Sequence, residues 1–119
     1  MDLTERLGIL KDSGTLSQKN HDNVKRVMEY FEKTRGTPLT EENAAPFITH
    51  LCMALERMDK GEKVESLDRN VYLTATQEPV FSDAEKCCKE ICEILPQLSG
   101  PESEYIVTHL CVLLEPDDG

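Results

Sequence analysis

The sequence predicts an all-α protein, a compact bundle of about five helices that forms a single domain over residues 1–119. Apolar residues recur at every third or fourth position along most of the chain, which is the period of an α-helix. No stretch of any length alternates between apolar and polar residues as a strand does. The 119 residues suit one ordinary domain. Because the chain has no tryptophan and 5% aromatic residues, its core must consist mainly of aliphatic, methionine and cysteine side chains.

The first two helices are marked by clear start and stop signals. Leu3, Leu7 and Leu10 share one face of a short first helix, which ends at the sequence DSG. Ser17 is a suitable N-cap for the second helix, because its hydroxyl can accept a hydrogen bond from a backbone N–H group of the first turn. This second helix runs to Gly36. Its inner face consists of Val24, Val27, Met28 and Phe31.

The third helix begins after Thr40, which can serve as its N-cap. Glu41 and Glu42 lie in its first turn, where the positive end of the helix dipole favours carboxylates. Pro46 has no backbone N–H group, so we expect it to kink the helix just before His50. The helix ends at the sequence MDKGE. Its inner face consists of Phe47, Leu51, Ala54, Leu55 and Met58.

Three further segments are expected to be helical in the second half of the chain. The least distinct is a short helix around residues 67–75, closed by Pro79. Ser82 is the expected N-cap of the next helix, and Pro101 the first residue of the last one, which runs towards Pro116. The inner face after Ser82 consists of Ala84, Cys87, Cys88, Ile91 and Leu95. The last helix carries Tyr105, Ile106, His109, Val112 and Leu113.

The five cysteines are expected to be reduced thiols, because their number is odd and no secretory signal precedes them. Cys88 and Cys92 lie four positions apart on a helix, so they could bind a metal ion together. Since Ile91, Ile94 and Leu95 flank them, we interpret both cysteines as small core residues instead. We therefore expect no metal and no cofactor.

The charge of the chain disfavours several classes of partner. Thirteen basic and 23 acidic residues give a net charge of −10. Nucleic acids and anionic membranes both require clustered lysine and arginine, so neither is an expected partner, and a basic protein surface is the more favourable one. No signal peptide and no apolar run of about 18 residues is found, so we expect a cytoplasmic protein.

Two of the three histidines lie in identical tetrapeptides, residues 49–52 and 108–111, both with the sequence THLC. A histidine and a cysteine two positions apart on a helix point about 200° apart, so neither tetrapeptide can chelate a metal by itself. One interpretation is structural, with both histidines as core residues of a repeated helical phrase. The other is functional, because a neutral imidazole can accept a phosphoryl group.

Each of these two histidines has a charged residue two turns away on the same side of its helix. Arg57 follows His50 by seven positions, and Glu102 precedes His109 by seven. A phosphoryl acceptor needs a nearby cation to balance the arriving charge, and Arg57 can supply it for His50. His21 has no comparable neighbour, and we interpret it as an ordinary surface residue.

Around these residues the sequence resembles the phosphotransferase-system regulation domain, the regulatory module of bacterial antiterminators and activators that the sugar phosphotransferase system controls. The segment FITHLCMALER is similar to the first motif of the family, an apolar pair and a histidine followed by Ala-x-x-Arg. The segment PESEYIVTHL is similar to the second, Pro-Glu-x-Glu, an aromatic residue, Ile and a histidine. The segments RLGILKDSGTLS and LTEENAAPFITHL look like the activator branch, so the resemblance covers nearly the whole chain. Thr49 stands where many members have Asp or Asn.

The resemblance implies an all-helical bundle that forms homodimers and is phosphorylated by the histidine phosphocarrier protein or by an enzyme II component. By position, His50 and His109 are the implied phosphoacceptors, and Arg57 and Glu102 are the residues that support them. No RNA-binding, DNA-binding or ATPase motif is found in the sequence. The resemblance thus implies a regulatory domain, not an enzyme, which needs no cofactor and signals to a transcriptional regulator or other partner supplied in trans.

Two other functions stay open at the level of sequence. The chain could be a helical adaptor or scaffold whose histidines do not receive phosphate. It could also be a metal-dependent or histidine-based phosphohydrolase, which is disfavoured because no carboxylates and histidines cluster at the spacing of metal ligands.

Overall fold

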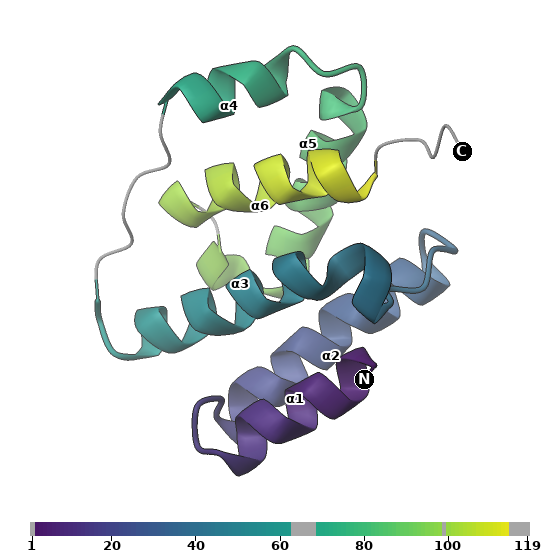
Figure 1. The fold of residues 1–119 in the computed structure, drawn as a ribbon. Coiled ribbons are helices and arrows are strands. Elements are labelled where there is room, and N and C mark those ends of the chain that lie inside the picture. Colours follow the sequence, from purple (N-terminus) through teal and green to yellow (C-terminus); the bar gives the residue numbers. More distant parts are fainter. Residues whose placement is uncertain (1, 63–68, 99, 115–119) are drawn as a thin grey trace. The chain divides into compact units, whose positions relative to one another are not determined.

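The computed structural model describes residues 2–62, 69–98 and 100–114. Within these ranges the chain forms six α-helices and one short 3-10 helix, and no strand (Figure 1). The predicted all-α class is therefore confirmed, and the predicted count of about five helices is close to the six α-helices of these ranges. None of the helices in the described ranges has the length and apolar character needed to cross a membrane.

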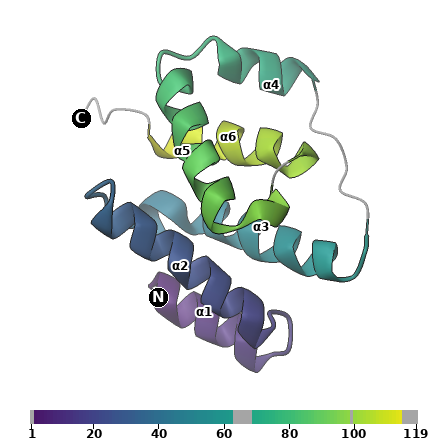
Figure 2. The same cartoon turned by 180° about the vertical axis from the view of Figure 1, so that it is seen from behind.

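The chain divides into two compact units, Met1–Lys63 and Val64–Gly119. In the described part of each unit, the last of three α-helices packs against both of the others (Figure 2). Each of these last helices carries one of the two THLC tetrapeptides. The single domain expected over residues 1–119 stays a prediction.

The first unit consists of α1 (Leu3–Asp12), α2 (Gln18–Lys33) and α3 (Glu41–Asp59), and each of these helices packs against the other two. α3 is one continuous helix that includes Pro46, and the kink expected just before His50 stays a prediction.

Both N-caps predicted for this unit are confirmed. The side chain of Ser17 accepts a hydrogen bond from the backbone N–H of Asn20 at 3.2 Å. Thr40 forms a reciprocal capping box with Asn43: the Asn43 backbone N–H donates to Thr40 Oγ1 at 3.3 Å, and Asn43 Oδ1 accepts from the Thr40 backbone at 2.8 Å. Because each cap satisfies N–H groups that the helix itself cannot pair, these residues fix where α2 and α3 begin.

Aromatic and ionic contacts join the three helices. Phe31 of α2 packs edge-to-face against Phe47 of α3, with ring centroids 6.2 Å apart, and against Tyr30 at 5.2 Å. The guanidinium of Arg6 on α1 binds both carboxylate oxygens of Glu41 at the start of α3. Most inner-face residues predicted for this unit are buried, whereas Leu10, Met28 and Met58 are half-buried. The buried apolar residues in its described part are Leu3, Leu7, Leu16, Val24, Val27, Tyr30, Phe31, Leu39, Ala44, Phe47, Ile48, Leu51, Cys52, Ala54 and Leu55.

The second unit consists of α4 (Arg69–Thr76), α5 (Phe81–Ile94), the 3-10 helix η1 (Pro96–Leu98) and α6 (Pro101–Leu113). α6 packs against α4, α5 and η1. α4 overlaps the short helix predicted around residues 67–75, whose first two residues lie outside the described ranges.

The prediction that Ser82 caps α5 is wrong. The backbone N–H of Phe81 donates to the Glu78 carbonyl at 3.0 Å, and this turn brings Val80 into helical geometry, with φ −81° and ψ −7°. The helix therefore begins one residue before Ser82, and Val80 at the N-cap forms no side-chain capping bond.

The start of α6 matches the prediction, because Pro101 lies in its first turn. Gly100 precedes it with φ +100°, a backbone conformation that residues with a Cβ rarely adopt. The helix ends at Leu113, with Leu114 as its C-cap, and Pro116 lies outside the described ranges.

Val112, which the last helix carries as predicted, is 72% exposed. On α6 the buried face is centred on Ile106, Val107, Leu110 and Cys111, so Val112 lies about 100° beyond its edge. In the described part of this unit, the other buried apolar residues are Ala75, Ala84, Cys87, Cys88, Ile91, Leu95 and Leu98.

Candidate functional site

His50 lies in the middle of α3 and is half-buried. Burial of the imidazole, and to a smaller extent the positive charge of Arg57, lower the pKa of His50 below its ordinary value of 6.5. At neutral pH the ring is therefore neutral, which is the form that has a free nitrogen lone pair and can act as a nucleophile.

Arg57 is the charged companion that the sequence predicted for His50. It lies seven residues later on α3, is half-buried, and donates from Nε to the backbone carbonyl of Met53 at 3.4 Å. Although the two residues are two turns apart, the charge of Arg57 affects the ionisation of His50. The structure thus brings a neutral imidazole and a permanent cation together on one helix.

His109 and Glu102 both lie on α6, but in different environments. His109 is half-buried, whereas Glu102 in the first turn is 1% exposed. A carboxylate in the first turn is favoured by the positive end of the helix dipole. His109 and His50 are thus alike in being half-buried.

His21 is less exposed than the surface residue that the sequence predicted. Its side chain is 14% exposed, and its Nδ1 lies 3.4 Å from Asp22 Oδ1. It lines a small groove of about 180 Å³ together with Leu7 of α1 and Met28 of α2. The low exposure of His21 was not expected from its polar neighbours in the sequence, Asn20 and Asp22.

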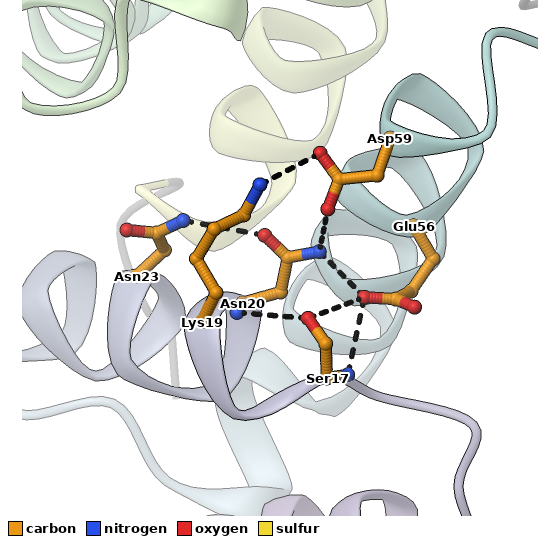
Figure 3. A network of polar contacts seen from close by, with 6 residues as sticks. All are labelled: Ser17, Lys19, Asn20, Asn23, Glu56 and Asp59. Atoms are coloured by element: carbon orange, nitrogen blue, oxygen red, sulfur yellow. Dashed lines mark hydrogen bonds and ion pairs between the residues drawn. The ribbon is translucent and has the colours of Figure 1, made fainter.

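Sequence reasoning missed a polar network that joins the start of α2 to the end of α3 (Figure 3). Asn20 is 1% exposed, and its Nδ2 donates to Asp59 Oδ2 at 2.9 Å and to Glu56 Oε2. The backbone N–H and the hydroxyl of Ser17 donate to the same Glu56 oxygen, at 3.2 and 3.1 Å. Lys19 Nζ donates to Asp59 Oδ1 at 3.0 Å.

The network keeps both of its carboxylates ionised. Burial opposes the ionisation of Glu56, but hydrogen bonds from Asn20 and Ser17 outweigh it and lower the Glu56 pKa. The bonds from Lys19 and then Asn20 lower the pKa of Asp59. Since Glu56 directly precedes Arg57, these contacts attach the segment of α3 that carries Arg57 to the start of α2.

The cysteines are free thiols, and most of them are core residues as predicted. Cys52, Cys87, Cys88 and Cys111 are buried, whereas Cys92 is half-buried. Burial raises the pKa of the Cys52 and Cys88 thiols to about 12, so neither is a reactive thiolate at neutral pH. In the described part of the chain, no three or more His, Cys, Asp or Glu side chains are grouped to hold a metal ion.

Comparison of the chain with known protein families, with curated proteins and with solved structures finds no match. The features that bear on function are therefore the two histidine motifs and the surroundings of their side chains. Within the first of these motifs, burial and the charge of Arg57 both lower the pKa of His50.

Proposed function

We propose that this chain is a phosphorylation-responsive regulatory domain of the bacterial sugar phosphotransferase system, similar to the phosphotransferase-system regulation domain. The observation that carries the proposal is the state of His50, a half-buried imidazole kept neutral by its burial and by the nearby Arg57. A histidine with a purely structural role needs no nearby cation. A phosphoryl acceptor benefits from the neutral imidazole, which can act as a nucleophile, and from the positive charge, which offsets that of the phosphoryl group.

The chemistry is a transfer of a phosphoryl group to a ring nitrogen. The lone pair of the neutral imidazole forms an N–P bond while the bond between phosphorus and the donor group breaks. The product carries up to about two negative charges where the ring had none. Arg57 offsets this charge through space or by charge-assisted hydrogen bonds to the phosphoryl oxygens.

His109 is proposed as a second acceptor. It lies in the second THLC tetrapeptide, and Glu102 belongs to the same sequence motif. Its helix, α6, is the last helix of the second unit, as α3 is of the first. Because each unit carries one of these two histidines, each phosphoryl group adds its charge to a different unit.

The proposed role is that of a receiver and not of an enzyme. The phosphoryl donor is the histidine phosphocarrier protein or an enzyme II component, and the added charge shifts the balance between dimer arrangements or partner-bound states. The output passes to a transcriptional regulator or another protein supplied in trans. A helical adaptor that receives no phosphate is the alternative, and half-burial of both histidines is compatible with it.

Phosphorylation in vitro distinguishes these two functions. The chain is incubated with phosphoenolpyruvate, the general phosphotransferase enzyme and the phosphocarrier, and acid-labile, base-stable phosphate is counted. We expect the parent protein to be labelled, His50→Ala and His109→Ala each to lose part of the label, and the double variant to lose nearly all of it. His21→Ala is the matched control and should keep the full label. Equal labelling of the double variant and the parent would refute the assignment.

A further inference from the structure

The second unit contains a pair of thiols that the proposed function does not use. Cys88 and Cys92 lie one turn apart on α5, so they share one face of the helix. After burial, each of the two thiols is among the groups that shift the pKa of the other, as expected of neighbouring side chains. Cys88 is 6% exposed and Cys92 is half-buried, which places the pair at the boundary between the core and the surface.

Both cysteines line an open groove of about 390 Å³ that residues of α4, α5 and α6 form within this unit. Tyr72 of α4 and Val107 of α6 are also part of the lining. The two thiols therefore line the same cavity within the second unit. The other three cysteines do not line this groove.

The charged residues of the groove favour a cation over an anion. Glu104 is paired with Arg69, whose Nη1 lies 3.2 Å from a carboxylate oxygen. The remaining charged residues of the lining are Glu85, Glu93 and Lys89, which leaves an excess of negative charge. Anions such as phosphate are thereby disfavoured near the two thiols.

The ligand set fits one kind of cation. Soft thiol ligands select Cu(I) or zinc among biological metals. Zinc in proteins takes three or four protein ligands, and in the described ranges no third His, Cys, Asp or Glu side chain converges with this pair. Cu(I) is satisfied by two sulfur ligands. We propose that Cys88 and Cys92 form a copper(I)-binding site in the groove of the second unit.

Binding is a ligand exchange without electron transfer. The ion arrives as Cu(I), two Cu–S bonds form, and the two thiol protons pass to solvent. Cys88 also gives up the contact that its Sγ makes with the carbonyl oxygen of Ser103 at 3.7 Å. The site is independent of the histidines, so its presence or absence is separate from phosphoryl transfer.

The proposal is tested by anaerobic titration of the reduced full-length chain with Cu(I), in competition with the chromophoric chelator bicinchoninate. We expect the parent protein to retain one equivalent of copper against the chelator, and Cys88→Ala and Cys92→Ala to retain none. Cys87→Ala is the matched control, because Cys87 is buried on the same helix but does not line the groove, and it should bind as the parent does. Circular dichroism establishes that each variant is folded.

A second measurement does not depend on any variant. X-ray absorption at the copper edge of the loaded parent protein should show two sulfur ligands and no nitrogen ligand. The proposal is overturned if Cys88→Ala and Cys92→Ala both bind copper, or if Cys87→Ala fails to bind it. It is also overturned if the absorption spectrum shows three sulfur ligands. Displacement of the copper by an equal concentration of Zn²⁺ would overturn it too, because the site would then not be a two-coordinate one.

Discussion

Arg57 lowers the pKa of His50 from two turns further along α3, adding to the larger effect of burial. Both residues lie on one helix, and Arg57 is anchored to the Met53 carbonyl, so the pair forms within the first unit alone. An imidazole that stays neutral beside a cation is suited to receive an anionic group.

The first prediction concerns this electrostatic effect. Replacing Arg57 with glutamine should raise the pKa of His50, because a repelling positive charge is removed, while burial still keeps the pKa below 6.5. Nuclear magnetic resonance titration of the histidine ring measures it. Lys60→Gln removes an exposed positive charge near the end of the same helix and should leave the His50 pKa nearly unchanged. An unchanged or lower pKa in Arg57→Gln would contradict the interpretation.

The second prediction follows from linkage between protonation and folding. The pKa of His50 is lower in the folded chain than in the unfolded one, so the unfolded state binds a proton first as the pH falls. The free energy of unfolding should therefore decrease as the pH falls from 6.5 through the lowered His50 pKa. His50→Gln should lose less stability over this window. Glu41, Glu56 and Asp59 also have lowered pKa values, but their effect on the unfolding free energy falls below pH 4.5. This effect is the same in the parent protein and in the His50→Gln variant. Parallel curves from chemical denaturation would show that His50 is not the group involved.

The third prediction concerns the polar network between α2 and α3. Asn20→Ala removes a buried donor that serves two carboxylates and should cost about 1–3 kcal/mol of unfolding free energy. Asn20→Asp should cost more, because it places a third carboxylate beside Glu56 and Asp59. Asn23→Ala is the control, since Asn23 donates only to Asn20 Oδ1, at 3.2 Å, among the bonds of this network. Equal stabilities of the Asn20→Ala and Asn23→Ala variants would mean that the network does not stabilise the unit.

The fourth prediction links Arg57 to phosphoryl transfer. Arg57→Gln should slow phosphorylation of His50 by about tenfold or more, the range expected when a charge-assisted interaction is lost. Arg57→Lys should recover part of the rate, because the charge remains although the planar guanidinium does not. The rates are measured in the His109→Ala background, so that only one proposed acceptor is present. Identical rates in the His109→Ala protein and in its Arg57→Gln and Arg57→Lys derivatives would show that Arg57 does not assist phosphorylation of His50.

Local signals predicted most of the helix boundaries. Ser17 and Thr40 cap their helices as expected, because capping depends on residues only three positions apart. Ser82 carried the same signal and failed, since the turn formed by Glu78 and Phe81 had already set the helical geometry. A capping residue is ineffective when a preceding turn begins the helix.

The contacts between helices could not be predicted in the same way. Asn20 binds Glu56 and Asp59, which are 36 and 39 residues away, and no spacing rule connects them. One signal was present, because Asn20 lies four positions before Val24 on the buried stripe of α2, where a polar residue needs partners. His50 and Arg57 were found because they share a helix and a motif.

The most direct test is to locate the phosphate on the unmodified chain. After incubation with phosphoenolpyruvate and the phosphotransferase components, the protein is digested at alkaline pH and its peptides are sequenced by tandem mass spectrometry. The proposed function predicts phosphate on His50, with His109 as the second acceptor, and none on His21. Phosphate on His21 alone, or on no histidine under conditions in which the phosphocarrier is fully charged, would contradict it.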